Sequence, residues 1–260
     1  MEGFDKIIPD FSNILLGNTK LSFENYNILV SDNSFNNNSS LFMSMFIAFF
    51  LKNNYKVIFV SCNESLIHQN SLCKKHGINL TNNENLYYID CFYSPYKRII
   101  KEELPLNENQ PYTFNTSKSK NYYNINEYLE SDEHFNENSL FEILKKIKKF
   151  DKSIVIIDSL LNLPLKDFKE FMNKLTLFSI ESRCNLMINL NKGLLNSDDD
   201  YVYSSYLADL ELEFIENESG FSKDIDGKIN VNYKSIDRQS ITLIYKLKEN
   251  GIDVFNNLVI

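Results

Sequence analysis

The chain has 260 residues, of which 43% are hydrophobic and 13% aromatic, so it can bury a sizeable core and does not have the composition of a disordered protein. Acidic residues (35) outnumber basic ones (27), and the formal net charge of −8 argues against an isolated nucleic-acid-binding protein, because phosphate neutralisation dominates such affinity. The four cysteines form no CxxC pair and no Cys/His ligand spacing, which indicates buried thiols in a reducing compartment.

The chain is expected to form a single domain over residues 1–260, because no Pro/Gly/Ser-rich linker divides it. Residues 1–23 carry scattered apolar side chains and are expected to form an N-terminal arm. The first residues lack a secretory signal pattern, and the longest apolar run, residues 41–51, is shorter than the ~20 residues of a membrane span. We therefore expect a soluble, intracellular protein without membrane contact.

Residues 27–62 read as a strand, a loop, a helix and a second strand. The runs 27–30 and 56–62 are apolar and largely β-branched or aromatic, and the helix over 41–52 is apolar nearly all round. In many such βαβ units the first loop is GxxxxGK[ST], which binds phosphate through backbone N–H groups and a lysine, and Mg²⁺ through a hydroxyl. The spacing therefore predicts the scaffold of a nucleotide site.

The loop Ser31–Ser40 lacks the chemistry of that site, since it contains no glycine and no lysine. Counted from the helix, Asn38 and Ser39 stand where the glycine and lysine of the motif would be, and Ser40 is the remaining hydroxyl. Ser39 or Ser40 is expected to cap the helix. The sequence thus predicts a fold of the nucleotide-binding type without a functional phosphate loop.

The middle of the chain continues the alternation and then departs from it. A helix is expected over about 64–76, ended by Gly77 in a left-handed conformation, and a strand over 86–90. Residues 92–136 are polar, contain three prolines and are too long for an ordinary connection. We expect a long, partly disordered insertion there, with poor order between 106 and 122.

Regular alternation returns after the insertion. Ser139 and Glu142 are spaced as a capping box at the start of a helix. The unbroken branched run at 153–159 predicts a central parallel strand buried on both faces, followed by a helix from residue 168 and a strand at 184–190. This order predicts an α/β fold with a mostly parallel, doubly wound sheet.

Residues 207–260 change to a period of two, with apolar and polar residues alternating. The pairs Asp226-Gly227 and Asn250-Gly251 have the composition of hairpin turns, because both residue types tolerate positive φ. A C-terminal antiparallel β-meander is therefore expected to extend the parallel core.

Ser40, Glu64 and Asp158 are the candidates for nucleotide chemistry. Asp158 ends the strongest strand, where P-loop ATPases hold Mg²⁺ through water, and we expect the loop of Ser40 to lie beside it. Glu64 follows the second strand, where a base would orient attacking water. The simpler interpretations are an Asp158 that caps a turn and a first-turn Glu64 favoured by the helix dipole. The chain has no GxSxG, HExxH or GxGxxG motif, and no metal or cofactor is expected.

A lysine group at 145–149 lies off the apolar stripe of the helix that begins near Ser139. Near a helix C-terminus such lysines are usually solvated charges favoured by the dipole. The alternative is an RNA-contacting face, whose removal would weaken tRNA binding and its salt dependence.

Several segments resemble subunit 6 of the Elongator complex. The resemblance is carried by residues 27–32, by 39–42, which open the first helix, and by 49–60. It continues through Ser65, His68, Lys75, Gly77, Ile78 and Leu80. It resumes in Gly220–Ile229, which reads glycine and phenylalanine, then a lysine and an aspartate, and then an Asp-Gly pair. Residues 92–136 are outside it. Family members show a glycine near the position of Asn38, so this chain departs from the family there.

The resemblance implies a RecA-like core without Walker motifs, in a heterohexameric ring with Elongator subunits 4 and 5. Such a ring joins the catalytic part of Elongator, which modifies wobble uridine in tRNA, and binds tRNA in a nucleotide-linked manner. It implies a non-catalytic subunit in the cytoplasm, with the nucleus as a second location. The alternative from the residues alone is a divergent ATPase or kinase that uses Ser40, Glu64 and Asp158.

Overall fold

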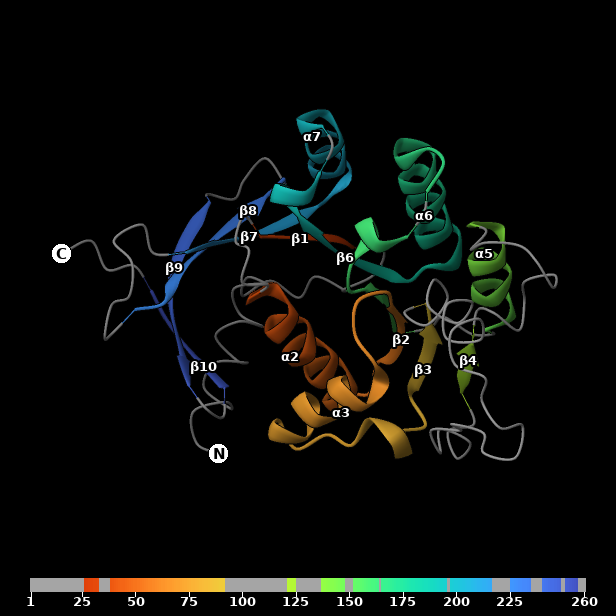
Figure 1. Cartoon of the computed structure of the whole chain (residues 1–260), viewed down its shortest axis with the longest axis horizontal. Helices are drawn as coiled ribbons and strands as arrows, with labels where there is room; N and C mark the ends of the chain where they lie inside the picture. The colour runs from red at the N-terminus through yellow and green to blue at the C-terminus, as the bar shows by residue number, and fades with distance from the viewer. Residues whose placement is uncertain are drawn as a thin grey trace, which may run out of the picture.

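A computed structural model of the chain describes residues 26–32, 38–91, 121–124, 137–147, 152–163, 165–195, 197–216, 225–234, 240–248 and 251–256. Helices lie on both faces of a ten-stranded sheet (Figure 1). The strands are β1 (Asn27–Asp32), β2 (Lys56–Ser61), β3 (Leu86–Asp90), β4 (Tyr122–Asn124), β5 (Ser153–Ile157), β6 (Asn185–Asn191), β7 (Leu210–Glu216), β8 (Gly227–Tyr233), β9 (Ile241–Lys248) and β10 (Gly251–Asn256). The α-helices are α2 (Asn38–Lys52), α3 (Leu66–Lys75), α5 (Glu137–Lys146), α6 (Phe168–Ser182) and α7 (Asp198–Leu207). Short 3₁₀ helices are η1 (Leu80–Asn82), η3 (Leu160–Asn162) and η4 (Lys192–Leu194).

The strands follow the order β10-β9-β8-β7-β1-β6-β5-β2-β3-β4. All neighbours from β7 to β4 are parallel. The neighbours from β7 to β10 are antiparallel. After β1 the chain crosses to β2, with β6 and β5 filling the space between, and after β6 it returns past β1 to β7. Reversal of direction places helices on both faces of the sheet, so the predicted doubly wound core with an antiparallel C-terminal extension is confirmed.

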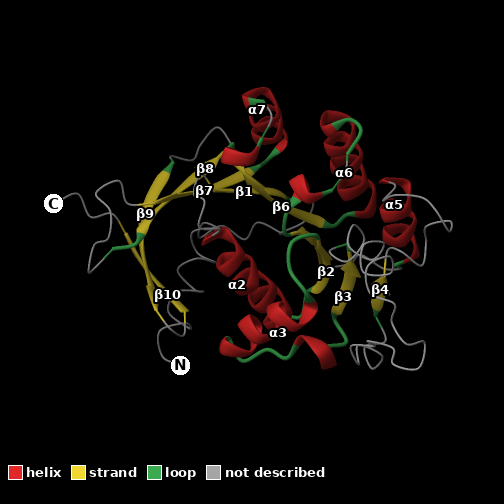
Figure 2. Ribbon diagram, in the orientation of Figure 1, coloured by secondary structure: helices red, strands yellow, loops and turns green. Residues whose placement is uncertain are grey.

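Helices cover both faces of the sheet (Figure 2), and an apolar layer lies on each face. Within β2, Val57 and Phe59 pack in the layer of α2 and α3, whereas Ile58 and Val60 pack in the layer of α5 and α6. This alternation explains why a strand with no polar interruption is stable, because a parallel strand between two helical layers is buried on both faces. β5 shows the same burial along its whole length, as its branched sequence predicts.

Helix ends follow the local sequence at several places. Ser65 is the N-cap of α3 and its side chain accepts the N–H of His68 at 3.3 Å. Gly77, just after α3, has φ of 77°, the left-handed conformation expected there. Asp167 caps α6 by accepting the N–H of Glu170 at 2.9 Å.

Two predicted helix starts are displaced. Helix α2 begins at Asn38, so Ser39 and Ser40 lie in its first turn and are not its N-cap. Helix α5 begins at Glu137, which places Ser139 inside the helix rather than at the capping position. In both cases the helix extends toward the N-terminus beyond the serine that was expected to cap it.

The predicted turn at Asp226-Gly227 is wrong. Gly227 opens β8 and is paired with Glu216 of β7, so it lies in the ladder. A Cβ at this position would be 2.5 Å from the carbonyl oxygen of Ile215 and 2.6 Å from the hydroxyl oxygen of Tyr245. Close backbone approach, and not positive φ, therefore requires glycine here. A hairpin does join β9 and β10, but Gly251 is the first residue of β10 and pairs with Lys248, so it too lies in the ladder and not in the predicted turn.

Other expectations concern segments that are little described. The predicted arm at 1–23 lies outside the described residues, and of the predicted insertion at 92–136 only residues 121–124 are described, where β4 pairs with β3. Helix α7 was not predicted at all, because its sequence is acidic and tyrosine-rich and has no apolar period. It connects β6 to β7 on the face that also carries α6 (Figure 1).

Candidate functional site

Asp158 directly follows β5 at the edge where the parallel strands end. Its Oδ1 accepts the N–H of Cys62 at 2.7 Å, and its Oδ2 accepts the N–H of Asn63 at 3.3 Å and the hydroxyl of Ser61 at 3.4 Å. The side chain is buried. Both carboxylate oxygens are therefore used to hold the loop that follows the neighbouring strand β2, which is a structural role for this residue.

The ionisation of Asp158 reflects this burial. Desolvation raises its pKa from the ordinary 3.8 to about 7, and the nearby charge of Glu64 acts in the same direction. The hydrogen bonds from the backbone N–H groups of Cys62 and Asn63 oppose the rise, since they favour the charged form. The carboxyl group is thus balanced between its two protonation states near neutral pH.

Glu64 lies in the same loop and is also engaged. Its Oε2 accepts the side-chain amide of Gln69 at 2.6 Å and lies 3.5 Å from Nε2 of His68. Its backbone carbonyl accepts the hydroxyls of Ser61 and Tyr88. Glu64 precedes the N-cap of α3, so it is not the first-turn residue that we expected, and its side chain braces the start of the helix.

The structure separates the three candidates into two groups. Glu64 and Asp158 follow the adjacent strands β2 and β5 and are close enough to interact electrostatically. Ser40 belongs to α2, which follows β1, and β6 lies between β1 and β5. The expectation that the strand before the first loop and the Asp158 strand lie side by side in the sheet is therefore wrong. Residues 33–37 and the side chain of Ser40 lie outside the described part of the chain.

Further polar residues complete this edge of the sheet. The side-chain amide of Asn189, near the end of β6, donates to the carbonyl of Asp158 at 2.8 Å. The amide of Asn162 donates to the side-chain oxygen of Asn63 at 3.1 Å. The hydroxyl of Tyr122 donates to Asp90 at 2.6 Å. Sequence reasoning singled out none of these residues for the site. A polar residue inside an otherwise apolar strand, as Asn189 is in β6, was the signal that could have found one of them.

All four cysteines are free and buried, as predicted. Cys62 and Cys91 follow paired residues of β2 and β3 and belong to the same apolar layer. Burial, followed by the neighbouring Cys91, raises the pKa of Cys62 well above its usual value, and burial raises the pKa of Cys73 and Cys184 to about 12. Thiolates are therefore disfavoured at these positions, which makes the thiols poor nucleophiles.

Neither a metal centre nor a membrane span is found in the described residues. Within these ranges no three His, Cys, Asp or Glu side chains are placed to hold a metal ion. In the same part of the chain no helix has the length and apolar character needed to cross a bilayer. Lys145 and Lys146 are exposed at the end of α5, as expected for charges off the apolar stripe, whereas residues 148–150 lie outside the described part.

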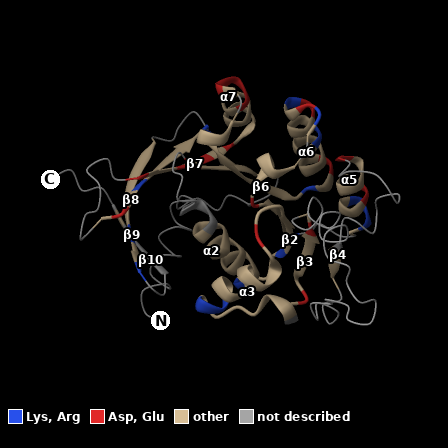
Figure 3. Ribbon diagram, in the orientation of Figure 1, with Lys and Arg blue, Asp and Glu red and all other residues tan. Residues whose placement is uncertain are grey.

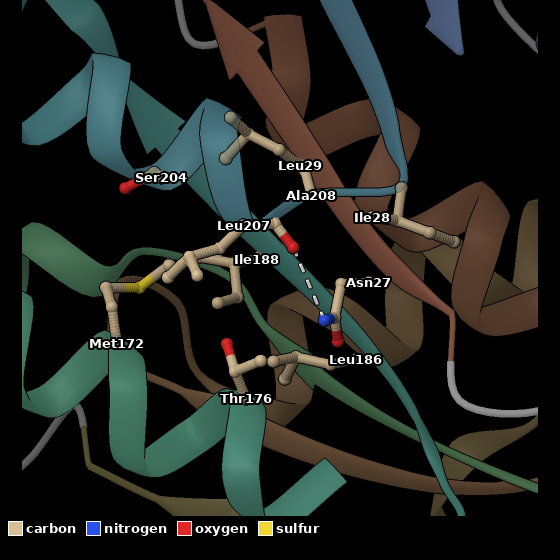
Figure 4. A pocket seen from close by; sticks show the side chains of 10 residues that line it. All are labelled: Asn27, Ile28, Leu29, Met172, Thr176, Leu186, Ile188, Ser204, Leu207 and Ala208. Atoms are coloured by element: carbon tan, nitrogen blue, oxygen red, sulfur yellow. Dashed lines mark hydrogen bonds between the residues drawn. The ribbon is translucent and has the colours of Figure 1, made fainter. Parts of the chain in front are cut away.

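A shallow crevice lies between the sheet and helices α6 and α7 (Figure 4). Its walls are mainly apolar and it has room for water rather than for a nucleotide. At its rim the side-chain amide of Asn27 donates to the carbonyl of Leu207 at 3.4 Å, and the hydroxyl of Ser204 is bonded to its own helix at Asp200. The lining residues are Asn27, Ile28, Leu29, Met172, Thr176, Leu186, Ile188, Ser204, Leu207 and Ala208. No charged side chain lines the crevice, so it lacks the groups that bind phosphate.

The order and direction of the strands define the class of fold to which the chain belongs. Two solved structures from Pyrococcus horikoshii are similar to this chain. One is a KaiC-like protein, 14% identical, with a TM-score of 0.54 over 89% of this chain and 90% of that chain. The other is an uncharacterised protein in complex with an unknown peptide, 11% identical, with a TM-score of 0.57 over 95% and 97%. At such identities the similarity shows the fold alone, and this fold has a RecA-like core.

A comparison with protein families identifies the chain more narrowly than its fold does. The family model described as Elongation complex protein 6 matches residues 8–249, so the chain belongs to this family, which is that of Elongator subunit 6. No curated protein matches the chain by sequence. The resemblance seen in the sequence at residues 27–60 and 220–229 is thereby confirmed.

Proposed function

We propose that the chain is a non-catalytic subunit of Elongator that forms a heterohexameric RecA-like ring with subunits 4 and 5. The observation that carries the proposal is the engagement of Asp158, whose two carboxylate oxygens bind the β2–α3 loop. A residue used in this way serves the fold. In an ATPase of this architecture the same strand end would be open to a hydrated Mg²⁺.

The sequence of the first loop supports the same conclusion. Asn38 and Ser39 replace the glycine and lysine that bind phosphate, so the charge needed at the β- and γ-phosphates is missing. Glu64, the candidate base, is bonded to Gln69 and paired with His68. A base has no reaction to assist where phosphate is not bound.

Membership of the family supplies the proposed context. The ring would join the catalytic part of Elongator and support wobble-uridine modification in tRNA, with tRNA bound by the assembled ring. The location would be the cytoplasm, with the nucleus as a second compartment. The net charge of −8 fits a subunit that reaches tRNA through the assembly rather than alone.

Co-expression with subunits 4 and 5, followed by native mass measurement, tests the proposal. We expect one assembly that contains two copies of each of three chains. A monodisperse single chain that binds neither subunit 4 nor subunit 5 would contradict the proposed function.

Nucleotide binding tests the alternative of a divergent ATPase or kinase that uses Ser40, Glu64 and Asp158. We expect neither ATP turnover nor micromolar ATP affinity from the purified chain. Turnover that is abolished by Asp158→Asn, with the fold intact, would establish the enzyme and overturn the proposal.

A further inference from the structure

Four large apolar side chains stand exposed on the outer surface of α6 and α7. Leu177 and Ile180 of α6 are 58% and 53% exposed, and Val202 and Tyr206 of α7 are 63% and 81% exposed. We call these four residues the α6–α7 ridge. Isolated exposed apolar residues are common on proteins, but a contiguous group of this kind marks an interaction site.

The two helices place the four residues on one surface. Both helices return from the end of one parallel strand to the start of the next, so they run in the same direction on the same face of the sheet (Figure 1). The hydroxyl of Tyr203 on α7 donates to the side-chain oxygen of Asn173 on α6 at 2.6 Å. Leu177 lies one turn beyond Asn173, and Tyr206 one turn beyond Tyr203. Ile180 lies one turn beyond Leu177, and Val202 one turn before Tyr206, so each helix contributes a pair of neighbouring exposed residues.

The fold itself does not need these side chains. Helix α6 packs on the sheet through a different stripe, which includes Phe171, Leu175 and Phe178. The exposed parts of the ridge amount to an area on the order of 400 Å², the size of an interaction patch on a monomer. Stable interfaces bury about 800 Å² on each partner, so the ridge would be the apolar centre of a larger contact.

Charge at the edge of the ridge indicates what covers it. Asp198 and Asp199 are exposed at the first turn of α7, where acidic side chains gather (Figure 3). Among the described residues no Lys or Arg forms an ion pair with either of them, whereas the ammonium of Lys174 on α6 is 2.6 Å from Glu170. The ammonium of Lys169 on α6 lies 5.7 Å from the centroid of the Tyr203 ring, so one basic side chain stands at this end beside the three aspartates of the first turn of α7. The surface is therefore apolar with an end that is acidic on balance. Two copies of a chain of net charge −8 repel each other, which disfavours self-association through this face.

We propose that the α6–α7 ridge docks a protein partner whose apolar face is edged by Lys and Arg side chains. The inference rests on the proposed function, since the partner is one of the neighbouring chains in the assembly. The apolar side chains would supply the buried centre of the contact, and Asp198 and Asp199 would select a basic edge and speed the encounter.

The test compares two variants within the assembly formed with subunits 4 and 5. The first is Leu177→Ser with Tyr206→Ser, and its matched control is Ile67→Ser, which changes a 51% exposed apolar residue of α3 on the opposite face. We expect the double variant to bind its partners at least about tenfold more weakly, since truncating anchor residues of an interface has this scale of effect. The control should bind as the unchanged chain does. Circular dichroism and thermal unfolding establish that both variants are folded.

A second variant tests the charge. Asp198→Lys with Asp199→Lys should slow association and reduce its dependence on salt, because an acidic edge attracts a basic partner. Association that is equally fast, or faster, would overturn the proposed basic edge.

The outcomes separate the inference from the proposed function. If the unchanged chain assembles and the ridge variant assembles equally well, the inference is wrong and the proposed function stands. If the unchanged chain does not assemble with subunits 4 and 5, both are wrong. Concentration-dependent self-association of the chain alone, lost in the ridge variant, would identify a second copy as the occupant and overturn the inference.

Discussion

The carboxylate of Asp158 accepts the backbone N–H of Cys62 at 2.7 Å, which ties the end of β5 to the loop after β2. Replacement by alanine would leave this N–H group and that of Asn63 buried without their acceptor. We expect Asp158→Ala to lower the free energy of unfolding by about 1–3 kcal/mol, the usual cost of an unsatisfied buried polar group. Urea denaturation measures the change. Asp158→Asn keeps one acceptor oxygen and should cost less, and equal losses in both variants would contradict the capping role.

The same residue gives the stability a pH dependence. Burial raises the pKa of Asp158 to about 7 in the folded chain, above the ordinary 3.8, so the folded state binds the proton more tightly than the unfolded state. This contribution is present in full below pH 3.8 and is lost as the pH rises through about 7. We expect the chain to lose stability relative to Asp158→Asn between pH 4 and pH 7. Unfolding at a series of pH values tests this, and parallel curves for the two proteins would contradict it.

Gly227 should tolerate no side chain. A Cβ there would be 2.5 Å from a backbone oxygen of Ile215 and 2.6 Å from the hydroxyl of Tyr245, so β7, β8 or the ring must move. We expect Gly227→Ala to cost about 1–3 kcal/mol or more, as overpacking of a core does. Gly77→Ala is the comparison, because Gly77 has open space but a φ of 77°. Its cost should be about 1–2 kcal/mol, from backbone strain alone. A neutral Gly227→Ala would show that the strands separate there.

The thiols should be protected in the native state. Burial raises the pKa of Cys73 and Cys184 to about 12, and that of Cys62 is also raised, so little thiolate is present at pH 8. We expect a chromogenic disulfide reagent to modify these cysteines only when the chain opens, at a rate that rises with urea. Fast stoichiometric labelling of the folded protein would contradict the burial.

The sequence predicted the strands well where the pattern of apolar residues matches the burial of the strand in the sheet. The branched run of β5 and the two-sided burial of β2 follow from the need of parallel strands to be covered on both faces. Helix α7 was missed because its exposed Val202 and Tyr206 break the apolar period that an amphipathic helix shows. Gly227 was assigned to a turn because an Asp-Gly pair is typical of hairpin turns. A close approach between strands also requires glycine, and only the tertiary structure distinguishes the two cases.

The candidate site was predicted in part. Glu64 and Asp158 do lie together, because the carboxyl ends of adjacent parallel strands meet at one edge. Their partners depend on side-chain directions that no spacing encodes, such as the bond from Gln69 to Glu64. The strand order was the other missing fact. β6 (Asn185–Asn191) lies between β1 (Asn27–Asp32) and β5 in the sheet, although it follows both of them in the chain, and no local pattern encodes this placement.

Substitutions in the first loop test whether Asn38 and Ser39 alone account for the expected absence of ATPase activity. We expect the double change Asn38→Gly with Ser39→Lys to produce no ATPase activity by itself. A lysine can bind phosphate, but Asp158 would still hold the β2–α3 loop and Glu64 would still be bonded to Gln69, so Mg²⁺ and the attacking water would lack their residues. Release of inorganic phosphate by the purified variant, with the unchanged chain as the control, is the measurement. Turnover that then falls on adding Asp158→Asn would show that the strand end is free to act, and the chain would be an ATPase disabled only at its loop.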